Sequence, residues 1–218
     1  MIDSTLIDSM GSDLTVVNAA RVSFNKKSEW DEDNTLTVSD SILISYLARH
    51  KHMSPFGHCF ATFHVKAPMF VARQLVKHKF LRWNEVSRRY VDDQPEYYYA
   101  PTWRGRAKDK KQGSSGEVSI SYRTISTLAK HELWCNKAYK ELLEQGVAPE
   151  QARSVLPQST MTEWYWSGSL DAYSDMCKLR RDYDAQYESR LVANSISMDL
   201  STLYPASWKA LLRSQVNE

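Results

Sequence analysis

Positive charge is concentrated in one short stretch of the chain, VARQLVKHKFLRWNEVSRRY, which runs from residue 71 to residue 90. Its only acid is Glu85, and it also holds His78. Lys and Arg side chains on a rigid element and its following loop can bind phosphate oxygens through charge-assisted hydrogen bonds. The stretch therefore predicts an anion-binding site built from six cations, which are Arg73, Lys77, Lys79, Arg82, Arg88 and Arg89.

The charge of the whole chain favours a small anion over a polymer as the ligand. The 218 residues include 28 Lys plus Arg and 26 Asp plus Glu, a formal net charge of +2. Proteins that bind DNA or RNA usually carry a broad basic face and a raised overall charge. Asn84 and Glu85 interrupt the cations and could hydrogen-bond a ribose or a base, and Arg180 lies on a second polar segment, CKLRRDYDAQYE. A nucleotide pocket is favoured, and a nucleic-acid-binding module stays the alternative.

The cysteines give no sign of a disulfide framework or a metal site. Cys59, Cys135 and Cys177 are odd in number and in no metal-ligand spacing, so no metal is expected. Reduced thiols are typical of a cytoplasmic protein. The first residues, MIDSTLIDSMGSDL, lack the basic and apolar regions of a signal peptide, and no apolar run approaches the ~20 residues of a membrane span. We expect no membrane association.

Hydrophobic periodicity predicts the elements that must position the cations. SDSILISYLARH (39–50) has helical spacing, and HCFATFHVKA (58–67) alternates as a strand. Pro68 suits the first turn of a helix that continues through MFVARQLVKHK. Residues four apart share a face of such a helix, which predicts a polar stripe and an opposite core side. The stripe would hold Arg73, Gln74, Lys77 and His78, and the core side Met69, Ala72, Leu75 and Val76.

The rest of the chain is expected to be mainly helical. One long helix should run from about Val118 to a stop at Gly146, a short one should start at Pro149, and 169–204 should be helical up to Pro205. The basic and Gly/Ser-rich segment 102–117 is expected to be a flexible loop. The length favours a single domain, 1–218, of the α+β class, mostly helices with a small antiparallel sheet.

The order of residues in this basic stretch resembles a known signature. RQLVKHKFLRWNEVSRRY resembles that of the flavin-dependent thymidylate synthases, the ThyX family, in which Arg-His-Arg is followed after seven residues by Ser. The spacing from Lys79 to Ser87 is the same. The similarity continues in family order through most of the chain, in the blocks NAARVSF, HMSPFGH, FHVKAPMFVARQ, GVAPEQARSVLP and LRRDYDAQYE.

The resemblance implies a fold, a reaction and an assembly. Members of this family are α+β proteins that form homotetramers with active sites where subunits meet. They bind FAD and convert dUMP to dTMP. The one-carbon unit comes from methylenetetrahydrofolate and the reducing equivalents from NADPH. A nucleic acid is not among the partners that the resemblance implies.

The resemblance also assigns residues by motif position. Arg180 matches the catalytic arginine that engages the uracil ring, where a guanidinium would stabilise developing negative charge. Ser87 is expected to contact the ligand, since no base is evident that could activate it as a nucleophile. The dUMP site is expected to contain Gln74, Lys77, Glu85, Ser87, Arg88, Arg89, Arg153 and Arg180. The FAD site is expected to contain His52, Ser54, Lys77, His78, Lys79, Glu85, Ser169 and Asp175.

Several positions depart from the family pattern. Lys77 and Lys79 replace two arginines, which keeps the charge but loses the planar, two-pronged donor and should weaken contacts to the flavin. Ser169 and Asp175 stand where many relatives have asparagines, and Asp184 replaces a common histidine. These departures indicate a divergent member of the family, such as a viral one. The expected location is a bacterial cytoplasm or an infected host cell. They leave open another pyrimidine nucleotide, such as dCMP, as the substrate.

Overall fold

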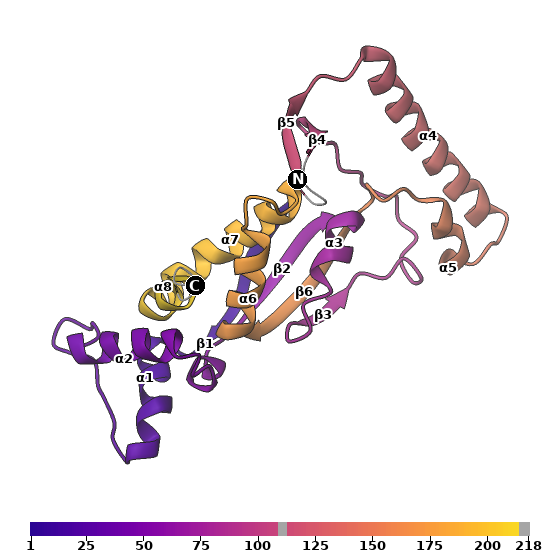
Figure 1. The fold of residues 1–218 in the computed structure, drawn as a ribbon. Coiled ribbons are helices and arrows are strands. Elements are labelled where there is room, and N and C mark those ends of the chain that lie inside the picture. The colour runs from indigo at the N-terminus through magenta and orange to yellow at the C-terminus, as the bar shows by residue number, and fades with distance from the viewer. Residues whose placement is uncertain (109–112, 214–218) are drawn as a thin grey trace.

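The structure is a computed structural model, and it describes residues 1–108 and 113–213. Its centre is an antiparallel four-stranded sheet with the order β1-β2-β6-β3 (Figure 1). The two central strands come from distant parts of the chain, so the sheet joins its two halves. The strands are β1 (Asp3–Met10), β2 (Phe60–Pro68), β3 (Arg82–Glu85) and β6 (Met161–Ser169).

The central strands bury one face through alternating side chains. The predicted alternation of 58–67 is confirmed, because its apolar residues Cys59, Ala61, Phe63 and Val65 are all buried. Gly168 on β6 leaves room for the Leu81 side chain, because a Cβ at this position would lie 2.3 Å from Cδ2 of Leu81 and force it to shift. The turn before β3 can therefore close onto the sheet.

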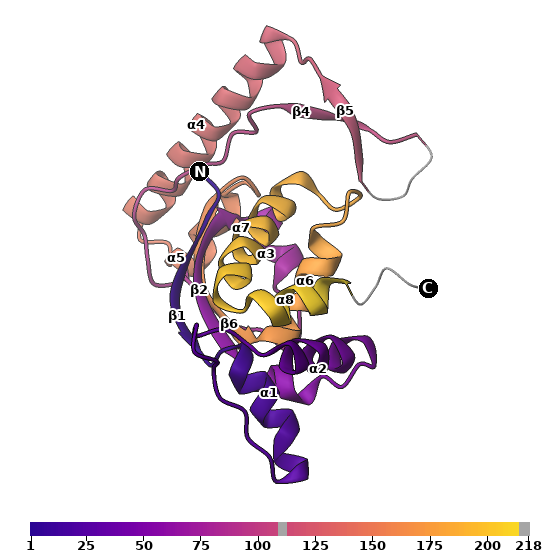
Figure 2. The same ribbon diagram turned by 90° about the vertical axis from the view of Figure 1, so that its left-hand side faces the viewer.

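Helices cover one face of this sheet (Figure 2). They are α3 (Met69–Leu75), α6 (Leu170–Arg180), α7 (Tyr187–Leu203) and α8 (Pro205–Arg213), with α1 (Asp13–Arg21) and α2 (Val38–Arg49) at one end. The carboxylate of Asp13 accepts from the backbone N–H groups of Ala206 and Ser207, both at 2.8 Å, and so caps α8. None of the helices in the described ranges is long and apolar enough to cross a membrane.

A projecting arm lies at the end of the molecule opposite α1 and α2 (Figures 1 and 2). It is formed by the strand pair β4 (Trp103–Arg106) and β5 (Ser114–Val118) and by the long helix α4 (Tyr122–Glu144). The short α5 (Pro149–Ala152) and the 3₁₀ turn η3 (Arg153–Val155) lead back from the arm to the sheet. Only Tyr139 of α4 is buried.

The α+β class is confirmed, but the helix that carries the first cations is shorter than predicted. It ends at Leu75, so Lys77, His78 and Lys79 lie in the following turn, and the predicted stripe is wrong beyond Gln74. Between Leu75 and Leu81 no residue is buried. Packing therefore stops stabilising the helix, and local propensity does not sustain so short a segment.

Three other boundaries differ from the predictions. The long helix begins at Tyr122, after β5, and segment 102–117 contains β4 and most of β5 in place of an irregular loop. Residues 109–112 of that segment lie outside the described residues. The predicted helix 169–204 is interrupted between α6 and α7, and Pro205 begins α8 because proline is well placed in a first turn.

Candidate active site

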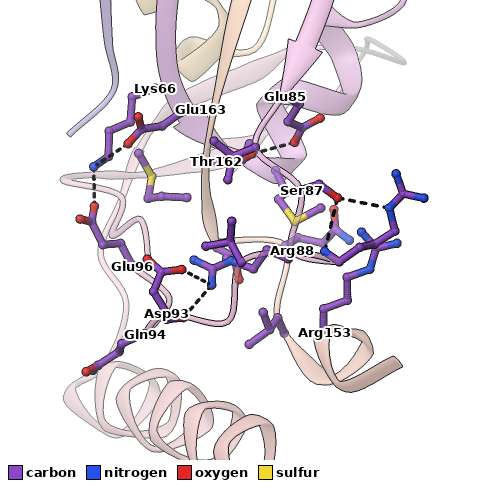
Figure 3. Close-up of a pocket in the computed structure, with 18 of the residues that line it drawn as sticks. Lys66, Glu85, Ser87, Arg88, Asp93, Gln94, Glu96, Arg153, Thr162 and Glu163 are labelled. Carbon is purple, nitrogen blue, oxygen red and sulfur yellow. Dashed lines mark hydrogen bonds and ion pairs between the residues drawn. The ribbon is translucent and has the colours of Figure 1, made fainter. Parts of the chain in front are cut away.

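A cavity of about 900 Å³ opens at the edge of the sheet beside β3 (Figure 3). Its walls come from residues 85–96, from the start of β6 and from the turn around Arg153. These segments meet because β3 pairs with β6, with Glu85 opposite Trp164. Five of the predicted dUMP residues line this one cavity: Glu85, Ser87, Arg88, Arg89 and Arg153.

Arg88 is held in place by Asp93. Its Nη1 donates to the backbone carbonyl of Asp93 at 2.7 Å and to Oδ1 of the same residue at 3.1 Å. The Arg88 side chain is only 17% exposed, whereas that of Asp93 is 67% exposed. Arg88 is therefore a partly neutralised part of the cavity wall. The sequence did not predict the role of Asp93, because Asp93 lies in an irregular loop where no periodicity indicates its partner.

Two further cations converge near Ser87. Arg89 donates to Oγ of Ser87 from its backbone N–H at 3.3 Å and from Nε at 3.2 Å. Figure 3 shows Arg153 rising from its turn toward the loop of Ser87 and Arg88. No base contacts Ser87 among residues 1–108 and 113–213, so a role for Ser87 as a ligand contact stays the better prediction.

Glu85 is oriented by two donors. Oγ1 of Thr162 donates to its Oε1 at 2.7 Å, and Nε1 of Trp83 donates to its Oε2 at 3.2 Å. The Trp83 ring is itself stacked on Trp164, with ring centroids 4.3 Å apart. The carboxylate therefore has a fixed direction, and its remaining lone pairs can accept from a hydroxyl or an N–H of a ligand.

The opposite wall of the cavity is a network of ion pairs. Lys66 lies 2.7 Å from Glu96 and 3.3 Å from Glu163, and His64 lies 3.1 Å from Glu163. The hydrogen bond that Lys66 donates to Glu96 is the main reason why the pKa of Lys66 is raised. Charges of both signs line this cavity, which suits one phosphate with neutral polar groups better than a polyanion.

A second polar cluster lies between the end of α3 and the end of α6. Arg180 donates from Nε to Nε2 of His78 at 3.1 Å and from Nη2 to the backbone carbonyl of Gln74 at 3.2 Å. Burial, and then the charge of Arg180, lowers the pKa of His78 to about 4. The predicted residues Gln74, His78 and Arg180 thus come together, but none of them lines the cavity beside β3.

The side chain of Gln74 is bound by residues that sequence reasoning missed. Gln74 donates from Nε2 to Oε1 of Gln186, and Ser189 donates from Oγ to Oε1 of Gln74 at 3.2 Å. Gln186 lies within the block LRRDYDAQYE, from which only Arg180 was assigned a role. The family block therefore contained Gln186, but only its hydrogen bond to Gln74 on α3 shows what this side chain does.

The residues assigned to FAD extend along α6 and around the turn after α3. His52 and Ser54 are exposed near the start of the 3₁₀ helix η2 (Ser54–His58), which contacts both α6 and β6. Ser169 ends β6, and Asp175 lies on α6, 3.9 Å from Lys178. That these residues bind one FAD molecule stays a prediction of the resemblance.

The turn after α3 has the residue types that a flavin nucleotide needs. Lys77 and Lys79 are exposed, and Phe80 between the turn and β3 is 80% exposed. Exposed ammonium groups can bind phosphate or carbonyl oxygens, and a bare aromatic side chain offers a flat surface to a ring. The chemistry of this group therefore fits FAD.

The cysteines are unsuited to nucleophilic catalysis. Cys59 and Cys177 are buried, and burial is the main reason why the pKa of each thiol is raised to about 12. The pKa of Cys135 is raised as well, again chiefly by burial. Thiolate is the reactive form, so a raised pKa makes each of the three a poor nucleophile.

The α+β fold thus carries a cavity of mixed charge and a separate Arg-His-Gln cluster, an arrangement that suits an enzyme for small phosphate-bearing ligands. A family model described as "Thymidylate synthase complementing protein" matches residues 5–206. A flavin-dependent thymidylate synthase of Thermus thermophilus is 41% identical over 206 residues, which cover 94% of this chain and 73% of the relative. That of Thermosipho africanus is 37% identical, covering 95% and 90%. The chain belongs to the flavin-dependent thymidylate synthase family, as the sequence resemblance indicated.

Solved structures agree with this assignment. A UMP/dUMP methylase, PolB from Streptomyces cacaoi, bound with 5-Br dUMP, superposes with a TM-score of 0.83 at 32% identity. The match covers 96% of this chain and 94% of that one. The same methylase bound with 5-Br UMP gives a TM-score of 0.84 at 29% identity. The family and the fold therefore rest on independent comparisons of sequence and structure.

Proposed function

We propose that the protein is a flavin-dependent thymidylate synthase, which reductively methylates dUMP to dTMP with FAD as its cofactor. One observation carries the proposal: the residues that the family motif assigns to dUMP at 85–89 and at Arg153 are far apart in the sequence but line one cavity. The names of the relatives and the dUMP analogue bound to the structural neighbour support it.

The cavity provides for each part of a nucleotide. Ser87, Arg89 and Arg153 would bind the phosphate through hydroxyl and guanidinium donors. Glu85, fixed by Thr162 and Trp83, would accept a hydrogen bond from a ribose hydroxyl. Each group is present before the ligand binds, so binding would require little reordering of side chains.

Arg180 would assist the chemical step at the pyrimidine. C5 of uracil is a poor nucleophile, and a guanidinium that stabilises negative charge on the ring nitrogen and carbonyl oxygen would activate the ring for attack from this carbon. His78 and the Gln74 carbonyl use two of the guanidinium N–H groups, and the others can face a ligand. Bound FAD supplies the redox chemistry, and Lys77, His78 and Lys79 would bind and orient it.

A second subunit would complete the site. Gln74, Lys77 and Arg180 are assigned to dUMP by the family motif, yet they do not line the cavity that the other dUMP residues form. In a homotetramer with active sites at subunit interfaces, the Arg180 cluster of one subunit would face the cavity of a neighbour. Methylenetetrahydrofolate would donate the carbon and NADPH the reducing equivalents, and the reaction would take place in the cytoplasm.

The decisive experiment is an assay of the purified protein. We expect visible flavin absorbance after loading with FAD, and dTMP formation from dUMP, methylenetetrahydrofolate and NADPH. Parallel reactions with dCMP and UMP test which nucleotide is the substrate, since the structural neighbour PolB is a UMP/dUMP methylase. Failure to bind FAD at saturation would reject the proposal. Tight and steeply salt-dependent binding of DNA or RNA would favour the nucleic-acid alternative instead.

A further inference from the structure

Gln74 is the centre of a directional chain of hydrogen bonds that joins α3 to the start of α7. Ser189 donates from Oγ to Oε1 of Gln74 at 3.2 Å, and Gln74 donates from Nε2 to Oε1 of Gln186. Gln186 then donates from Nε2 to Oε2 of Glu188 at 3.1 Å. The hydroxyl of Tyr98 donates to the other oxygen of this carboxylate at 3.5 Å. Every donor in the chain is directed toward Glu188.

The carboxylate fixes this direction. An ionised carboxylate only accepts hydrogen bonds, whereas a side-chain amide can turn over and exchange its donor and acceptor ends. Because Glu188 accepts, Gln186 must present its NH₂ group to it and its oxygen to Gln74. Gln74 must then direct an N–H to Gln186, and the Ser189 hydroxyl can rotate to suit either orientation. Glu188 therefore sets the orientation of an amide that it does not touch.

One donor of this amide is left over. The second N–H on Nε2 of Gln74 has no acceptor in the part of the chain that the structure describes. We propose that Glu188 is a positioning residue for nucleotide recognition, which acts through Gln186 to offer this N–H to an oxygen of the nucleotide. The inference rests on the proposed function, which places Gln74 in the dUMP site.

A fixed donor selects the chemistry of what it meets. A phosphate, ribose or uracil oxygen can accept from the Gln74 N–H, but an amino group such as that of cytosine cannot. A reversed amide would present its own oxygen and repel the same ligand atom. The orientation also matters more inside a protein than in water, because an unpaired polar group costs more there.

Glu188→Gln tests the direction of these hydrogen bonds, because the two side chains have nearly the same shape. The new amide can donate as well as accept, so Gln186 and Gln74 lose their fixed orientation. We expect dUMP to bind the flavin-loaded protein about tenfold more weakly, the loss of one good hydrogen bond, in a calorimetric titration. Flavin content and melting temperature should stay close to those of the wild type.

The matched control exchanges the two residues, Gln186→Glu with Glu188→Gln. A carboxylate at 186 would accept directly from Gln74 and from the new amide at 188, which restores the direction of the chain. We expect this double variant to recover wild-type affinity for dUMP. A purely structural need for charge at 188 would not be met by the exchange, so the two explanations are separated.

The outcomes are distinguishable. Unchanged dUMP affinity in Glu188→Gln, or a double variant as weak as the single one, overturns the role of Glu188 and leaves the proposed function standing. If Glu188→Gln does not fold, the double variant alone decides, because it must match the wild type. A flavin-loaded wild type that binds no dUMP would overturn the proposed function together with this inference.

Discussion

Nε of Arg180 donates a hydrogen bond to Nε2 of His78 at 3.1 Å, although the two residues are 102 positions apart. Burial, and secondarily the guanidinium, lowers the pKa of His78 to about 4, so the imidazole is neutral at pH 7 and carries its proton on Nδ1. The other partner of Arg180 is the backbone carbonyl of Gln74. Both partners are neutral, and the guanidinium is positioned without losing its charge to a carboxylate.

Arg180→Ala should therefore retain flavin but lower the rate of dTMP formation about 10²- to 10³-fold, the effect of removing one electrostatic donor from an active site. Arg180→Lys keeps the charge and loses the Nε donor, so we expect an intermediate rate. Arg181→Ala is the matched control, because Arg181 donates instead to Asn194 at 2.9 Å. A near-normal rate for Arg180→Ala would remove Arg180 from the chemical step.

His78 should make the folded protein sensitive to acid. The unfolded chain takes up this proton near pH 6.5, the usual pKa of histidine, whereas the folded chain does so only at about pH 4. The contribution of neutral His78 to stability is thus complete above pH 6.5 and is lost as the pH falls toward 4. The melting temperature should fall more steeply between pH 6.5 and pH 4 in the wild type than in His78→Gln. An equal fall in both proteins would contradict this role of His78.

Exchanging Lys77 and Lys79 for arginine should tighten flavin binding. Both side chains are exposed, so the change needs no repacking, and a guanidinium adds a second donor to each contact. We expect a gain of about two- to tenfold, measured by quenching of flavin fluorescence. Lys27→Arg, at a side chain that is 79% exposed, serves as control. Unchanged or weaker binding would count against a flavin contact here.

Two inactive variants should restore each other if active sites lie between subunits. Arg153→Ala disables the cavity, and Arg180→Ala disables the cluster. In mixed oligomers of the two, roughly a quarter of the sites would combine an intact cavity with an intact cluster, so co-expressed and co-purified subunits should recover a similar share of activity. The double variant in one chain is the control. No recovery would indicate that each subunit builds its own site.

The sequence predicted the local elements well where burial decides them. The alternating apolar residues of 58–67 and the proline and glycine boundaries of the helices near 149 and 146 follow from local stereochemistry. The helix after Pro68 was predicted too long. Its length depends on whether the residues after Leu75 are buried against other elements, and residues 76–80 are not. Such contacts come from β6 and α7, which local periodicity does not contain.

The sequence by itself determined the family, the α+β class and the residue types of the site. The motif from Gln74 to Arg89 is contiguous, so it can be recognised without knowing the fold. Only the tertiary structure decided which of these residues meet. The pairing of β3 with β6 brings Arg153 and Ser87 into the wall of one cavity. The end of α3 brings His78 to Arg180 and Gln74 to Gln186. Charges and amides separated by about a hundred residues acquire partners only when the sheet register and helix packing fix their distance. For this reason the cavity beside β3 and the Arg180 cluster can be seen only in the structure.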